Sequence, residues 1–253
     1  MILHKLAEAL RGQNWFTVVL EILIVVVGIF IGLQANDWNQ ARIDRADEVR
    51  YLERLHTDLL TDISRLYRGE MLARQRIQQV ELLLAGIANS EVVARQPSQF
   101  VEAVEKVGWS SYRRLMPKAY SELVSKGRTT LIRSESIRDA LAEYYGRIDF
   151  WGGLLSQTSF VHDFYISSAG VLNKDQLAAI ELSSRESTEF VANVDDALVI
   201  AEQLNMRTQG TRLLPKIYQG HELVITVVAE LRERNEALQV EIDKYLKGGG
   251  DDP

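Results

Sequence analysis

Glu21 is the residue whose surroundings in this sequence most need a chemical explanation. Between Trp15 and Leu33 the only polar residues are Thr17 and Glu21, so the carboxyl group lies inside an otherwise apolar run. A charged acid near the centre of a membrane helix costs on the order of 3 kcal/mol on insertion scales. A carboxyl in such a place can hold a proton and hydrogen-bond to a neighbour, pair with a cation, or line a path for protons or ions.

Apart from Glu21, no set of residues has the spacing of a known catalytic, cofactor or metal site. The sequence contains no HExxH, GxxxxGK[ST], GxGxxG or GxSxG pattern and no cysteine. Asp58 and Asp62 share a helix face at i,i+4, and we expect both carboxylates to be solvated. His162 stands beside Asp163, but a lone histidine at a packing interface is the favoured interpretation. We therefore expect no enzymatic activity, no catalytic residue, no cofactor and no metal. The histidines are scattered: His4, His56, His162 and His221.

The helical spacing of the apolar run places small residues beside the acid. Gly28 and Gly32 form a GxxxG pair, which lets two helix backbones approach closely in lipid. The other faces carry large aliphatic and aromatic residues, which suit lipid tails. We predict that this helix associates with another through the face of Glu21, Gly28 and Gly32. At about 100° per residue, that face comprises Glu21, Val25, Gly28, Gly32 and Ala35.

Three arrangements would accommodate the Glu21 carboxyl. It can be protonated and hydrogen-bonded across an oligomer interface. It can instead pair with a cation of another protein or line a polar path. Finally, it can lie at the membrane surface if the span shifts toward Trp38. That shift leaves 12 apolar residues, from Ile22 to Leu33, and requires local thinning or tilt. The residue types alone leave these arrangements open.

The apolar run has the length of a membrane span. Its 19 residues rise about 28 Å as a helix, close to the ~30 Å thickness of the hydrocarbon core. Trp15 and Trp38 bracket it as interfacial anchors, so we assign a transmembrane helix to residues 15–38 and a short amphipathic segment to residues 1–14. A cleaved signal peptide is disfavoured, because Leu33 stands where a small residue is wanted. The lipid bilayer is therefore one expected partner.

Composition and charge narrow the other classes of partner. The formal net charge of −6 argues against nucleic acid, because phosphate binding needs an excess of Lys and Arg. The share of hydrophobic residues, 46%, and of charged residues, 25%, is that of a folded globular chain. Positive charges are nearly balanced across the span. The short basic N-terminal side, typical of a signal anchor, favours a C-terminal part outside the cytoplasm.

The helical pattern continues beyond Trp38 without a breaker. A stripe of apolar residues predicts one long helix packed on a core, with Gly69 and Gly86 as weak points. We assign residues 39–246 to an extramembrane helical domain with long first and last helices, and residues 247–253 to a flexible tail. The stripe comprises Leu52, Leu55, Leu59, Ile63, Leu66, Ala73, Ile77, Val80 and Leu84.

Between the two long helices the sequence predicts several shorter ones. The stretch NSEVVARQPSQF, residues 89–100, is expected to be a loop from which Pro97 opens a helix near residues 98–107. A helix capped by Ser134 is expected to run toward Gly170. Two more are expected over residues 174–182 and 187–204.

The last predicted helix, residues 215–246, carries a heptad repeat. Asn235 falls on its seam, where a lone Asn can fix register or partner number. The repeat fits a coiled coil between chains. It also fits a helix packed antiparallel on the long first one, with Asn235 meeting a polar group there, and we favour this intramolecular packing. The seam comprises Ile217, His221, Val224, Val228, Leu231, Asn235, Leu238, Ile242 and Tyr245.

Two blocks, LEILIVVVGIFIGLQANDWNQARIDRADEVRYLERLHTDL and AYSELVSKGRTTLIRSESIRDALAEYY, resemble a large bacterial family of uncharacterised single-span membrane proteins. The span of that family typically reads G-E-I-x-L-V-V-x-G-I-L-I-A-L and is followed by W-N. This sequence departs from it at Leu20, where Gly is frequent, and at Gly32, where Ala is usual. The resemblance covers roughly the first 150 residues and implies a topology but no activity. Matching positions are Glu21, Ile22, Val26, Gly28, Ile29, Ile31, Leu33, Trp38 and Asn39, then Tyr120, Leu123, Gly127, Leu131, Ile132, Leu141 and Tyr144.

These observations predict an all-α protein in which one N-terminal transmembrane helix continues into a long helix of an extramembrane antiparallel bundle. The expected location is the bacterial inner membrane, with the C-terminal domain in the periplasm. The leading hypothesis is a non-enzymatic interaction, scaffold or sensory module that forms homo-oligomers, or binds a partner membrane protein, through its membrane helix. The alternative is a transport or channel component with Glu21 in an ion or proton path. An enzyme whose site is assembled across helices without a motif is a third class.

Overall fold

The computed structural model describes residues 15–112, 115–156 and 159–248, and every secondary-structure element in these ranges is helical. The predicted all-α class is confirmed. The chain divides into two units, residues 1–53 and 54–253, and each is described by itself. The predicted amphipathic segment 1–14 and the tail beyond Gly248 lie outside the described residues.

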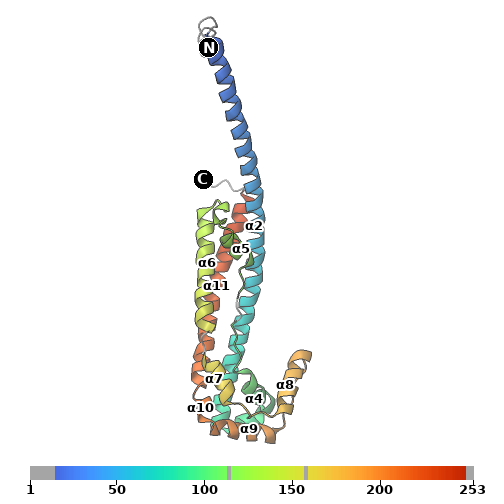
Figure 1. Ribbon diagram of the computed structural model, residues 1–253. Coiled ribbons are helices and arrows are strands. Elements are labelled where there is room, and N and C mark those ends of the chain that lie inside the picture. Colours follow the sequence, from blue (N-terminus) through green and yellow to red (C-terminus); the bar gives the residue numbers. More distant parts are fainter. Residues whose placement is uncertain (1–14, 113–114, 157–158, 249–253) are drawn as a thin grey trace, which may run out of the picture. The chain divides into compact units, whose positions relative to one another are not determined.

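The first unit contains the beginning of helix α2, which extends over Trp15–Ala88 (Figure 1). Every residue from 19 to 43 whose side chain is described is exposed. Within the described part of the chain, α2 is the one helix that is long and apolar enough to cross a membrane, judged by length and composition. Beyond Trp38 the helix becomes polar, and its side chains pair along their own helix, as Arg45 does with Glu48 at 2.6 Å. The unpartnered surface of this unit is therefore the apolar part.

The second unit contains the rest of α2 and the other helices. Short helices lead from α2 to the long helix α6, and further short helices lead from α6 to the second long helix, α11. The bounds are α3 Ser90–Arg95, α4 Pro97–Lys106, α5 Lys118–Ser125, η1 Thr129–Leu131, α6 Glu135–Ser156, α7 Ser159–Ser167, α8 Lys174–Glu186, α9 Val194–Met206, α10 Thr208–Thr211 and α11 Leu214–Lys247.

Three helices of this unit, α2 from residue 54 onward, α6 and α11, pack along one another. The side chains of α11 contact α2 in reverse order: Asp243 lies 3.3 Å from His56, and Arg232 lies 3.0 Å from Glu70. Because higher numbers in α11 meet lower numbers in α2, these two helices are antiparallel. The ion pairs between α6 and α11 follow the same reverse order, so α6 is parallel to α2. They are Arg234–Glu143 at 2.6 Å and Arg147–Glu230 at 3.0 Å.

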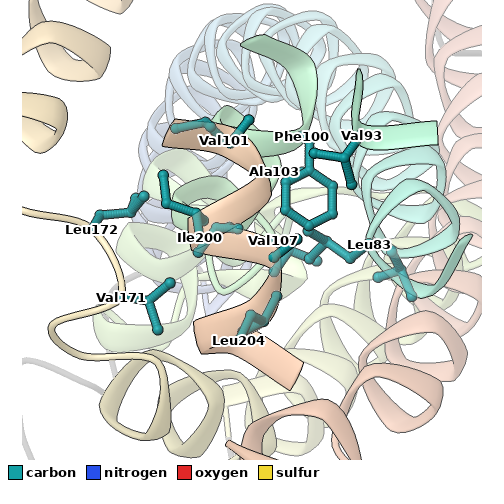
Figure 2. Packing of buried hydrophobic residues seen from close by; sticks show 14 of the residues in the cluster. Leu83, Val93, Phe100, Val101, Ala103, Val107, Val171, Leu172, Ile200 and Leu204 are labelled. Atoms are coloured by element: carbon teal, nitrogen blue, oxygen red, sulfur yellow. The ribbon is translucent and has the colours of Figure 1, made fainter. Parts of the chain in front are cut away.

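A second hydrophobic core lies where the C-terminal end of α2 meets the short helices. Phe100 of α4 is fully buried at its centre and packs on α2 beside Gly86. Helix α9 covers this core with Ile200 and Leu204, and the segment after α7 adds Val171 (Figure 2). The short helices thus pack where α2 ends and α11 begins, and this core joins those two long helices.

Several expected boundaries were wrong, and local capping explains most of them. The expected loop over residues 89–100 contains helix α3, because the Asn89 side chain accepts a hydrogen bond from the Glu91 amide and caps it. The expected helix over residues 187–204 begins only at Val194, since Ser187 adopts a left-handed φ of 55° that ends α8.

Candidate functional site

The predicted association face lies on the exposed apolar part of α2. Glu21, Gly28 and Gly32 fall on one side of this helix, since their spacings of seven and eleven residues are close to whole turns. A Cβ atom added at Gly28 or Gly32 would meet nothing within 4 Å. Trp38 is exposed, and the side chain of Trp15 lies outside the described residues. No other part of the described chain covers this face.

The apolar surface around this face is large. Ile22 is 59% exposed, Phe30 64% and Leu33 59%, and the positions between them are similarly open. Soluble monomers rarely expose contiguous apolar patches of more than a few hundred Å². An exposed apolar surface of this kind is typical of segments that contact lipid or another chain.

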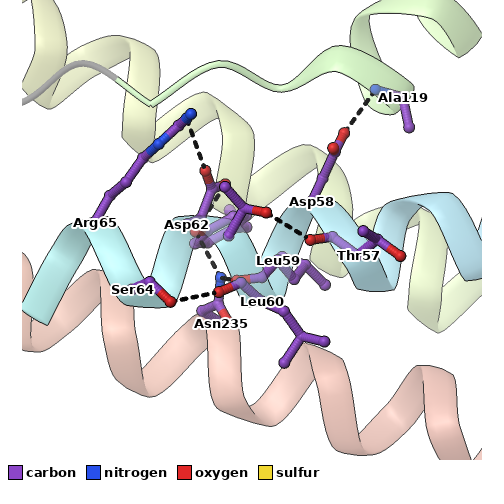
Figure 3. Close-up of polar contacts among 11 residues, drawn as sticks. Thr57, Asp58, Leu59, Leu60, Asp62, Ser64, Arg65, Ala119 and Asn235 are labelled. Atoms are coloured by element: carbon purple, nitrogen blue, oxygen red, sulfur yellow. Dashed lines mark hydrogen bonds and ion pairs between the residues drawn. The ribbon is translucent and has the colours of Figure 1, made fainter.

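A buried polar cluster lies in the second unit, around Asp62. The Asp62 side chain is 1% exposed, which overturns the expectation that this carboxylate is solvated. Its neighbour Asp58 is half-buried and accepts a hydrogen bond from the Ala119 amide at 2.8 Å (Figure 3). The two acids share a helix face but have different environments, because α6 and α11 cover Asp62.

A chain of hydrogen bonds runs from the partly exposed Gln239 to Asp62. Gln239 donates from its amide nitrogen to the Asn235 side-chain oxygen. Asn235 donates to the Tyr144 hydroxyl at 2.8 Å and to the Leu59 carbonyl at 3.2 Å. Tyr144 in turn donates to Asp62 Oδ2 over 3.5 Å, a long contact. Asn235, expected on a helix seam, is thus fully buried and joins α11 to both α2 and α6.

The electrostatics of the cluster follow from burial. The pKa of Asp62 is raised from 3.8 to about 7, mainly by removal from water, and the negative charge of Asp58 contributes to the rise. The Arg65 guanidinium, 3.9 Å away, and the Tyr144 hydroxyl oppose the rise. Burial, followed by the charge of Asp62, also raises the pKa of Tyr144 and of Tyr145. These phenols stay neutral, so the cluster holds one group that titrates near neutral pH.

His221 forms a second buried polar site on α11. Its Nδ1 lies 2.9 Å from Ser111 Oγ, and the ring also interacts with the Val107 backbone. A small recess lies beside it, lined by Ser110, Tyr112 and Gly220 among others. Burial and then the Arg76 charge lower the pKa of His221 from 6.5 to about 4. The imidazole is therefore neutral at physiological pH.

One spacing relates the two polar sites. A Cβ atom on Gly69 would lie 3.8 Å from the Val228 side chain, which sets these residues level on the antiparallel helices. Seven residues before Gly69 is Asp62, and seven after Val228 is Asn235, so the two polar residues share a layer. In the other direction, Arg76 is seven residues after Gly69 and His221 is seven before Val228, so Arg76 and His221 share a second layer. Both polar layers lie in an otherwise apolar seam whose residues alternate by three and four. They are Leu55, Leu59, Asp62, Leu66, Gly69, Ala73, Arg76, Val80 and Leu83.

The predicted stripe was confirmed at most positions, including Ile77, but it was wrong at Ile63 and Leu84, which are not buried. It also left out Asp62, Arg76 and Leu83, which are buried. Leu84 is 41% exposed and Leu83 fully buried. Following apolar residue types drew the stripe away from two polar positions that the three-four spacing of the helix includes.

A family model described as a family of unknown function (DUF6090) matches residues 21–189 of the 253. The chain belongs to this family. The expected membership of an uncharacterised family is confirmed, whereas the span signature stays a prediction. The DUF6090 match contains the apolar segment from Glu21 onward, Asp62 and Tyr144, but ends before Asn235 and His221. Comparison with curated proteins and with solved structures gives no match.

Proposed function

We propose that this DUF6090 protein is a membrane-anchored, non-enzymatic interaction module. Its apolar α2 segment spans a bilayer and associates with a second copy through Glu21, Gly28 and Gly32. The observation that carries the proposal is that residues 19–33 are all exposed and form a largely apolar surface that no other part of the described chain covers. Burying this surface in lipid removes it from water, and the glycines then permit close helix contact.

Glu21 fits this arrangement as a hydrogen-bonding group. At the contact between two helices its carboxyl, once protonated, bonds to the other helix and avoids the cost of a charge in lipid. The proposed location is the bacterial inner membrane, with the second unit in the periplasm. Reporter fusions at the C-terminus test this orientation: activity of a reporter that works only in the cytoplasm would contradict it.

Crosslinking of the full chain in membranes tests the association. Gly28→Leu should reduce the crosslinked dimer severalfold, because the side chain separates the helix backbones. Val26→Leu is the matched control: it adds bulk on a different face and should leave the dimer unchanged. Equal crosslinking of Gly28→Leu and wild type would contradict the association face.

Variants of Glu21 distinguish a carboxyl that stabilises the helix contact from one that conducts protons or ions. Glu21→Gln keeps a hydrogen-bonding side chain, so the dimer should persist, whereas Glu21→Leu should weaken it. Proton flux into vesicles that is present with wild type and abolished by Glu21→Gln, with the dimer intact, would instead indicate an ion path.

A further inference from the structure

The carboxyl of Asp62 is buried with little to compensate its charge. Its side chain is 1% exposed. It accepts a 3.5 Å hydrogen bond from the Tyr144 hydroxyl and lies 3.9 Å from the Arg65 guanidinium. Both distances are at the far limit of such interactions. By contrast, the partly exposed Asp58 has a 2.8 Å bond from a backbone amide. A buried acid with so few close donors favours its neutral form.

The groups that face Asp62 come from every element packed around it. Along α2 these are Asp58, a second acid one turn away, and Arg65, whose side chain is 38% exposed. Helix α6 contributes the hydroxyls of Tyr144 and Tyr145. From α5, Tyr120 stacks on Tyr145 with ring centroids 4.6 Å apart, and α11 contributes the neutral amide of Asn235. Among the described residues, Asp62 is thus surrounded by one partly exposed cation, one partly exposed acid and several hydroxyl groups.

We propose that Asp62 is a proton-binding site that controls the packing of α2, α6 and α11. When the carboxyl is protonated, it forms a neutral polar layer with Asn235 and Tyr144, and the three helices close on it. When it ionises, the buried charge draws water and the layer loosens. The second unit would therefore respond to pH near neutrality. This proposal concerns that unit alone and does not rest on the membrane association proposed above.

The direction of the effect follows from linkage. The folded pKa of Asp62, about 7, lies above its unfolded value of 3.8, so the folded state binds the proton more tightly. The contribution of Asp62 to stability is fully present below the unfolded pKa and is lost as pH rises through about 7. A shift of this size changes the ratio of folded to unfolded protein by up to about a thousandfold.

The test is the pH profile of unfolding for the full chain in detergent micelles, wild type against Asp62→Asn. Asparagine mimics the neutral carboxyl, so the two proteins should have equal stability near pH 4. The variant should become progressively more stable than wild type toward pH 8. His221 titrates in the acid range in both proteins, so its effect cancels in the difference. Asp58→Asn is a second variant on the same face. It removes the negative charge that raises the pKa of Asp62, so it should lose less stability than wild type between pH 5 and 8.

A direct observation of the proton makes the test independent of any variant. In wild type with ¹³C-labelled aspartate, one carboxyl resonance should titrate near neutral pH, and Asp62→Asn should lack it. A parallel pH profile for wild type and Asp62→Asn would overturn the proposal. So would a wild-type spectrum without such a resonance, even if the variant failed to fold.

Discussion

Asn235 and Tyr144 are joined by a 2.8 Å hydrogen bond in the buried seam between α11 and α6. The same amide group of Asn235 also donates to the Leu59 carbonyl of α2, so one side chain links three helices. A buried amide in this position is satisfied by its neighbours, which would lose their partner if it were removed.

Asn235→Ala should therefore destabilise the protein by about 2–4 kcal/mol, because a buried cavity is added to the loss of three hydrogen bonds. Chemical denaturation of the full chain in micelles measures the change. Gln239→Ala is the matched control: it removes the partly exposed donor to Asn235 and should cost at most about 1 kcal/mol. Equal costs for the two variants would show that burial of the Asn235 network is not what matters.

The fold was predictable where helical periodicity was regular. The heptad repeat of the last helix correctly predicted buried positions from Ile217 to Tyr245, because large apolar residues recur there every three or four positions. Short elements such as α3 were missed, since six residues offer little periodicity and the Asn89 cap also occurs in loops.

The polar layers were harder to predict, for a physical reason. A sequence shows that Asp62 and Arg76 are charged, but whether a charge is solvated depends on what covers it. The cover comes from α6 and α11, which lie far away in the chain. Only when the two helices are aligned in register does it become visible that Asp62 shares a layer with Asn235, and Arg76 with His221. The association face stays a prediction, because its residues were chosen from the spacing within one helix and no other part of the described chain contacts its glycines.

Gly86 is a position where a side chain does not fit. A Cβ atom there would lie 2.5 Å from the Phe100 ring and 2.9 Å from Val93, closer than atoms can approach. Gly86→Ala should destabilise the protein by about 1–3 kcal/mol, since the strain of overpacking exceeds the gain in helix propensity. Thermal unfolding in micelles measures it. An unchanged or higher midpoint would show that α4 can shift away without cost.

Gly146 gives the opposite prediction. It lies within α6, it is exposed, and a Cβ atom there would meet nothing within 4 Å. Gly146→Ala should therefore stabilise the protein by up to about 1 kcal/mol, through helix propensity and the reduced freedom of the unfolded chain. The same unfolding assay gives both values, and a loss of stability here would indicate a contact on this face of α6 that a methyl group disturbs.

His221 should make the protein sensitive to acid. Its folded pKa, about 4, lies below its ordinary 6.5, so the unfolded chain binds the proton more readily. Its contribution is complete above about pH 6.5 and falls as pH decreases toward 4, with a total loss of about 3 kcal/mol. His221→Phe keeps an aromatic ring but cannot titrate, so its difference in stability from wild type should narrow over this range as wild type weakens.

The pH dependence of stability that His221 causes is opposite to that of Asp62. The folded state favours the deprotonated imidazole of His221 and the protonated carboxyl of Asp62. The double variant with Asp62→Asn should then have the flattest stability profile between pH 4 and 8, and a steep profile in that double variant would mean that other groups dominate.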